Sequence, residues 1–68
     1  MNEEVFNLSV RKFLKTFGVT AQREIEKAVD AGLRSGSVPD DAVLPARARL
    51  VIDGIEEEIV VEGEIRLE

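Results

Sequence analysis

Residues 46–67, ARARLVIDGIEEEIVVEGEIRL, decide the fold, because apolar and polar residues alternate there on both sides of a turn signal. A period of two is typical of strands with one apolar face, and Asp53-Gly54 strongly favours a hairpin turn between them. We therefore predict an antiparallel β-hairpin with strands over about 46–53 and 58–67.

The pairing of these two strands follows from the same alternation. Because residues opposite each other must share a face, the alternation allows Leu50 to face Ile59 or Val61. The connection is either a type II′ turn at Gly54-Ile55 or a longer loop that includes 56–58. Either register brings arginines of the first strand near glutamates of the second, a favourable cross-strand charge pattern. These residues are Arg47, Arg49, Glu62 and Glu64.

Residues 37–45, SVPDDAVLP, precede the hairpin and have the composition of a loop, with two prolines and two aspartates. The period of two begins only at Ala46, so we expect the first strand to start after the second proline. Val38, Val43 and Leu44 are expected to anchor the loop to the core.

The N-terminal part of the chain predicts an amphipathic helix over about 3–17. Asn2 is a suitable N-cap, and Gly18 suits the left-handed position that ends a helix. The apolar residues between these caps repeat at helical spacing within one arc of about 100°. They are Phe6, Val10, Phe13, Leu14 and Phe17.

A second helix is predicted over about 21–35, with Thr20 as its N-cap and Gly36 as its stop. Because only Gly18 and Val19 precede that cap, the two helices must turn back on one another. The apolar residues of the second helix are Ala21, Ile25, Ala28, Val29, Gly32 and Leu33. The predicted fold class is α+β, two helices packed on a C-terminal hairpin, in a single domain over 1–68.

The composition limits how such a small domain is stabilised. The chain has 68 residues, 44% of them hydrophobic, and contains Cys 0 and His 0. Disulfides, thiolate chemistry and zinc sites are therefore excluded, and we expect no cofactor and no metal. Small domains commonly depend on disulfides, metals or oligomerisation, so oligomerisation is the aid that remains.

The charge is unevenly distributed along the chain. Residues 1–36 carry six basic and five acidic side chains, net +1, whereas 37–68 carry three basic and nine acidic ones, net −6, for a total of −5. This acidity opposes nucleic acid and anionic lipid as partners. The N-terminus has no apolar signal segment and no run approaches the roughly 18 apolar residues of a membrane span, so a cytoplasmic location is expected.

No group of residues predicts catalysis. The serines have no histidine to activate them, and no glycine-rich phosphate loop is present. Glu62 and Glu64 lack the accompanying polar groups of an acid–base site, and the glutamates at 56–58 do not have calcium-ligand spacing. Arg11, Lys12 and Lys15 complement the negative end of the predicted first helix more simply than they form an anion site. We expect no enzymatic activity.

A nucleic-acid-binding helix-turn-helix is the alternative function, because Phe17–Thr20 would form its turn and a basic stripe of Arg23, Lys27 and Arg34 follows. The register opposes this interpretation. With Gly18 as the turn glycine, the buried positions of the second helix fall on Glu24 and Lys27, and burying a charge is costly. A solvated helix face with ion pairs, for example Asp30 with Arg34, explains the charges better.

A protein interaction or self-association module is the leading hypothesis. Val5 and Leu8 lie away from the phenylalanine arc and form a second small apolar patch. The second strand, which includes Val61 and Ile65, is long and free of proline, so its edge suits pairing with a second copy in a homodimer. A monomer whose edges are protected by glutamate and arginine remains the alternative.

Three segments resemble a family of short uncharacterised bacterial proteins, a domain of unknown function. They are FNLSVRKFLKTFGVTAQREIEKAV at 6–29, LPA at 44–46 and VEGEIRLE at 61–68. The resemblance covers nearly the whole chain and departs mainly in the connecting loop and around 54–58. It implies a bacterial origin and a stand-alone protein of about this length, with no assigned activity, ligand or functional residue.

Overall fold

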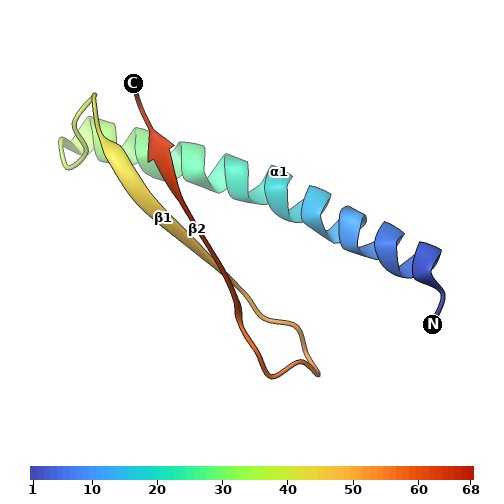
Figure 1. Ribbon diagram of the computed structural model, residues 1–68. Coiled ribbons are helices and arrows are strands. Elements are labelled where there is room, and N and C mark those ends of the chain that lie inside the picture. The colour runs from blue at the N-terminus through green and yellow to red at the C-terminus, as the bar shows by residue number, and fades with distance from the viewer. The chain divides into compact units, whose positions relative to one another are not determined.

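The computed structural model describes all residues, 1–68, as one helix followed by a two-stranded antiparallel hairpin (Figure 1). The helix α1 spans Glu3–Ser35, and the strands β1 and β2 span Val43–Leu50 and Ile59–Arg66. The predicted α+β class and the hairpin are confirmed. The prediction of two helices is wrong.

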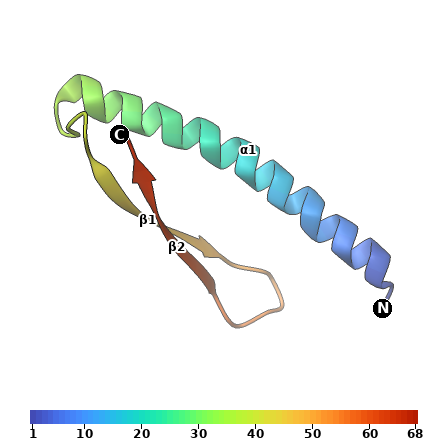
Figure 2. The same ribbon diagram turned by 45° about the horizontal axis from the view of Figure 1, so that its top comes forward.

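The helix α1 continues without a break through Gly18 and Thr20, where the sequence predicted a turn (Figure 2). Ending a helix there would leave carbonyl and N–H groups unpaired at two new termini, whereas an interior glycine costs only about 1 kcal/mol relative to alanine. The apolar spacing also continues in phase across this point, so an unbroken helix keeps one apolar face. The residues that carry it across are Leu14, Phe17, Ala21 and Ile25.

The two outer ends of α1 are where the sequence predicted them. The Asn2 side chain accepts a hydrogen bond from the backbone N–H of Val5 at 3.2 Å. Gly36 has a left-handed φ of 81°, and its N–H donates to the Leu33 carbonyl at 3.3 Å. Of the two glycines that suit a C-cap, only the second is used as one.

The strands pair with Leu50 opposite Ile59, one of the two predicted registers. Arg47 then lies directly opposite Glu62, as expected from the charge pattern. β1 begins three residues earlier than predicted, at Val43, so that Pro45 lies inside the strand. The prediction assigned Pro45 to the loop by the composition of 37–45, but a strand tolerates proline where the nitrogen faces outward.

One hydrogen bond beyond the strands shows which way each nitrogen faces. The N–H of Leu67 donates to the Ala42 carbonyl at 3.1 Å, and these two residues continue the register of the ladder. Because hydrogen-bonded pairs alternate in antiparallel sheets, the even residues of β1 and the odd residues of β2 bond to each other. The nitrogens of Pro45 and Glu64, which face each other in the register, therefore point to the two outer edges.

The connection between the strands contains a four-residue turn over 52–55. The N–H of Ile55 donates to the Ile52 carbonyl at 3.0 Å, and Gly54 has a φ of 93°. Gly54 is thus the third residue of the turn, whereas a type II′ turn at Gly54-Ile55 would make it the second. The predicted turn type is wrong, and the alternative of a longer loop, over 51–58, is confirmed.

Two compact units divide the chain, Met1–Ser37 and Val38–Glu68. No residue of α1 is buried, and the one buried hydrophobic residue is Ala42, beside the start of β1. Of the predicted anchors, Val38 and Leu44 are half-buried, but Val43 is exposed because its side chain lies on the other face of β1 from Leu44. That residues 1–68 form a single domain stays a prediction.

Candidate interaction surfaces

One face of the hairpin is entirely apolar. Residues directly opposite each other in the register share a face, so alternation along both strands gathers the apolar side chains on one side. We call this set the sheet face. It consists of Leu44, Ala46, Ala48, Leu50, Ile59, Val61, Gly63 and Ile65. The predicted surface residues Val61 and Ile65 both belong to it, and Val61 is exposed.

The outer edges of the two strands differ. On β1, the outward position at 45 is a proline, which cannot donate a hydrogen bond. On β2, every outward position keeps its N–H, and we call this row the β2 edge. Its donors are at Val60, Glu62, Glu64 and Arg66. Sequence reasoning marked the edge of this strand by Val61 and Ile65, whose nitrogens face β1. The register places the outward donors at the even residues of β2 instead.

Charged side chains on the hairpin form two long ion pairs. Arg49 lies 3.7 Å from Glu58, and Arg66 lies 3.7 Å from Glu64 in the same strand. All four side chains are about half exposed or more, so each pair contributes little to stability. The Arg66–Glu64 pair lies along β2, and charged side chains on an outer strand are a pattern that protects exposed edges, as the monomer alternative requires.

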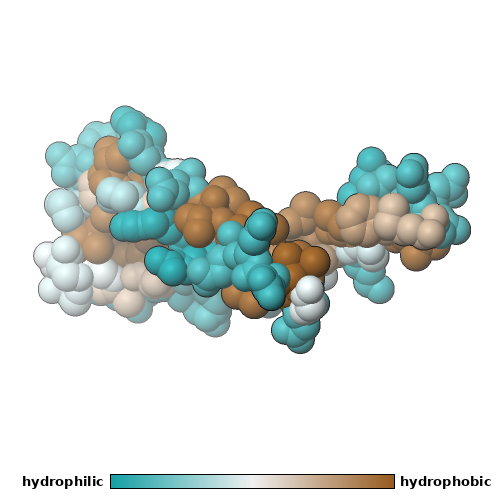
Figure 3. Space-filling model, turned by 60° about the horizontal axis from the view of Figure 1, so that its bottom comes forward, coloured by the Kyte–Doolittle hydropathy of each residue, from teal (hydrophilic) through white to brown (hydrophobic).

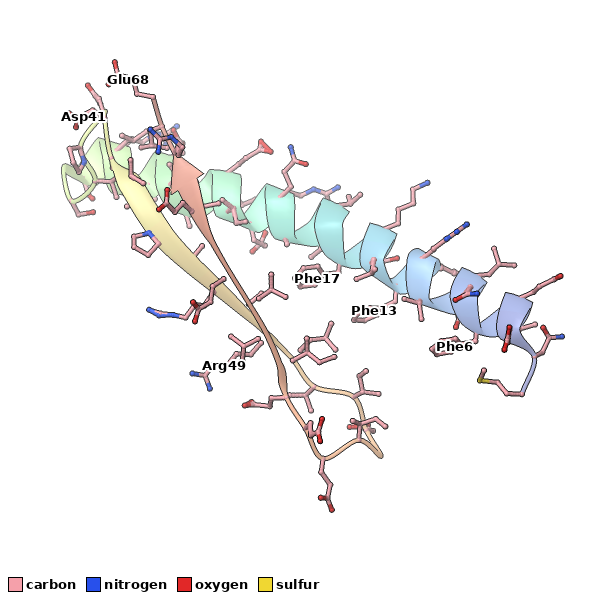
Figure 4. The ribbon with its side chains drawn as sticks, viewed as in Figure 1. Phe6, Phe13, Phe17, Asp41, Arg49 and Glu68 are labelled. Atoms are coloured by element: carbon pink, nitrogen blue, oxygen red, sulfur yellow. The ribbon has the colours of Figure 1, made fainter.

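The helix carries a row of phenylalanines along one side. Phe6, Phe13 and Phe17 project from the same side of α1 (Figure 4), as their spacing predicts. All three are exposed, as are Val10 and Leu14 between them. Figure 3 shows such apolar side chains reaching the surface as brown areas interrupted by teal hydrophilic ones. Within its own unit the helix has nothing that covers this row.

Val5 and Leu8 form the second apolar patch expected on the helix. Both side chains are exposed, and helical geometry turns them by about 100° and 160° from Phe6. They lie on α1, whereas Val61 and Ile65 lie on β2, in the other compact unit. Two of the four predicted surface residues therefore belong to α1 and two belong to β2.

The basic residues of the nucleic-acid alternative do share one face of α1. Helical spacing places Arg23, Lys27 and Arg34 within about 40° of one another. Two of their charges are offset by acidic neighbours. Lys27 pairs with Glu24 at 3.4 Å, and Arg34 pairs with Asp30 at 2.9 Å, the latter as predicted. The turn that a helix-turn-helix requires is absent, and nucleic-acid binding stays an untested prediction.

No cluster of three or more histidine, cysteine, aspartate or glutamate side chains is placed to hold a metal ion. The glutamates at 56–58 lie in the loop between the strands. The helix α1 is not apolar enough along any stretch of the necessary length to cross a membrane.

Comparison with known proteins adds one finding. A model of a family of unknown function, DUF6494, matches residues 1–68, the whole length of the chain. The chain belongs to this family. The resemblance found in the three sequence segments is thereby confirmed. No match is found among the curated proteins or among the solved structures.

Proposed function

We propose that this chain is a non-enzymatic self-association module that pairs with a second copy of itself along the β2 edge. The observation that carries the proposal is the difference between the two outer edges of the hairpin. Pro45 interrupts the row of donors on β1, whereas β2 presents an uninterrupted row of N–H and carbonyl groups.

A two-stranded sheet gains stability from such pairing. Isolated two-stranded hairpins are marginal in water, whereas sheets of three or more strands with an apolar face are stable. Antiparallel pairing of β2 with its copy across a two-fold axis makes a four-stranded sheet. The two sheet faces then join into one apolar surface of twice the width.

Matched proline substitutions test the proposal. Glu62→Pro removes an outward N–H from β2, and Arg47→Pro removes the outward N–H directly opposite on β1, so both leave the β1–β2 hydrogen bonds in place. Light scattering at micromolar concentration should show a dimer for the unmodified chain and for Arg47→Pro. For Glu62→Pro, the concentration at which the copies dissociate should rise.

The alanine variants Glu62→Ala and Arg47→Ala separate the loss of charge from the loss of the N–H. Both should remain dimeric, because each keeps its N–H. A chain that stays monomeric at high concentration, or equal effects of the two prolines, would rule out pairing along β2.

A further inference from the structure

The apolar stripe of α1 has a regular repeat that runs almost its full length. Successive members lie four, four and three residues apart, so the pattern repeats every eleven residues. An eleven-residue repeat corresponds to about 3.67 residues per turn, close to the 3.6 of a straight helix, so the stripe drifts little around the axis. We call it the helix stripe. Its members are Phe6, Val10, Leu14, Phe17, Ala21, Ile25, Ala28 and Gly32.

The paired strands of the hairpin are shorter than the helix stripe. The stripe, from Phe6 to Gly32, is about 39 Å long, whereas a strand of 8 residues is about 26 Å long. The paired strands therefore match at most about two thirds of the length of the stripe. A second long helix matches the stripe in length, and a second copy of this chain supplies one.

The sizes of the side chains determine the direction in which two copies fit. Apart from Ile25, the large members of the stripe lie in the N-terminal half of α1, and the small members lie in the C-terminal half. A parallel pair would place large against large at one end and leave gaps at the other. An antiparallel pair centred near residue 19 matches Phe6 with Gly32, Val10 with Ala28, and Phe17 with Ala21, so that large and small side chains interlock.

Gly18 supports a close approach of the two helices near the centre of this antiparallel pair. It lies inside α1, where glycine is unfavourable by about 1 kcal/mol, and a Cβ added there would meet nothing within 4 Å. The chain by itself therefore has no packing reason for a glycine at 18. Gly18 lies at the level of the centre of the antiparallel pair and borders the stripe beside Ile25, so the absence of a side chain there lets the partner helix approach on that side.

The available area is sufficient for a specific pair. Phe6, Phe13 and Phe17 are 51%, 52% and 45% exposed. With about 200 Å² for a fully exposed phenylalanine side chain, the three offer on the order of 300 Å² per chain. Two copies, together with the aliphatic members of the stripe, reach the roughly 1,000 Å² that specific interfaces bury.

We infer that a second copy of this chain covers the helix stripe by antiparallel pairing of the two α1 helices. The inference rests on the proposed self-association, since both have the same partner, but it concerns a different surface from the β2 edge. It assigns Gly18 a role at the crossing point and makes the helix, rather than the Val5 and Leu8 patch, the contact between copies.

Disulfide trapping tests the direction of pairing, because the chain has no cysteine of its own. Val10→Cys and Ala28→Cys chains are mixed, refolded together under reducing conditions and then oxidised. Mass spectrometry should find the mixed disulfide and neither homodimer, because like cysteines in an antiparallel pair would be about 27 Å apart along the axis. Homodimers without the mixed species would show a parallel pair and overturn the inference.

A matched control uses the opposite side of the helix. Leu8→Cys and Asp30→Cys lie at matching levels of the same antiparallel pair, but about 160° away from Val10 and Ala28 around the axis. This mixture should give no disulfide. A mixed disulfide here, with none between Val10→Cys and Ala28→Cys, would place the contact on the Leu8 side instead.

The same trapping in a Glu62→Pro background separates this inference from the proposed function. Persistence of the mixed disulfide there would show that the helices pair independently of the β2 edge. Dimers by light scattering with no helix disulfide would leave the proposed function standing and overturn only the helix pairing. A chain that is monomeric and gives no disulfide would overturn both.

Discussion

The rings of Phe13 and Phe17 stack one helical turn apart, with their centroids 6.5 Å apart and their planes inclined by 22°. This contact lies just before Gly18 and joins Phe17, a member of the helix stripe, to Phe13, which borders the stripe. Such pairs add only about 0.2–0.5 kcal/mol to an isolated helix. The larger contribution of these rings is therefore expected between copies.

Replacing Phe17 by alanine should separate those two contributions. Phe17→Ala should leave the helical circular dichroism of the monomer nearly unchanged, while dissociation measured by sedimentation shifts to much higher protein concentration. Val19→Ala, on the opposite side of α1, is the control and should leave the dissociation unchanged. Equal effects of the two variants would contradict a contact on the phenylalanine side.

Substitution of Gly18 tests whether α1 is continuous. Gly18→Pro should lower the free energy of unfolding by about 3 kcal/mol, because proline removes a helical hydrogen bond and clashes with the preceding turn. Gly18→Ala should raise helicity in dilute, monomeric samples, since alanine is favoured by about 1 kcal/mol inside a helix. Circular dichroism and urea unfolding measure both. If residues 18–20 were a turn, Gly18→Ala would lower helicity instead.

Substitution by alanine should destabilise the chain at the two glycines with positive φ but not at the glycine in β2. Gly36→Ala and Gly54→Ala force alanine into left-handed conformations, with φ values of 81° and 93°, and should each cost about 1–2 kcal/mol in thermal unfolding. Gly63→Ala is the matched control, because Gly63 has no positive φ and its added Cβ meets nothing within 4 Å. It should be neutral or stabilising. A large cost at Gly63 would indicate a partner packed on the sheet face.

Duplex DNA should not bind the chain appreciably, even at low salt. The charges of Lys27 and Arg34 are offset by Glu24 and Asp30, and the net charge is −5. Fluorescence anisotropy with labelled duplex at low salt is the measurement. Binding that weakens with added salt and is reduced by Lys27→Glu would revive the nucleic-acid alternative.

Several features were predictable from the sequence because they depend on neighbours in the chain or across one turn. Asn2 and Gly36 act through their own backbone geometry, and the hairpin follows from alternation around Asp53-Gly54. The register is nearly determined as well. A slip by one residue would exchange the polar and apolar faces of the sheet. The pairing of Arg47 with Glu62 belongs to a register that keeps the apolar residues of both strands on one face.

The start of β1 and the row of outward donors on β2 could not be predicted from the local sequence pattern. Pro45 signals a loop when the sequence is considered one residue at a time, since proline cannot donate to a ladder. Whether the missing N–H disrupts the hydrogen-bond ladder depends on which way the nitrogen of Pro45 faces. The pairing of β1 with β2 decides that direction. The same pairing shows that the free donors are at the even residues of β2 rather than at Val61 and Ile65.

By itself, the sequence determined the α+β class, the outer caps of the helical region and the hairpin. Each of these depends on short-range periodicity or on a residue whose backbone preference acts alone, whereas the family follows from resemblance over the length of the chain. The three-dimensional structure decided that α1 is one helix and not two, because Gly18 is compatible with either a cap or a helix interior. The choice between them depends on hydrogen bonds along the whole of Glu3–Ser35, which no single residue near the predicted turn reveals.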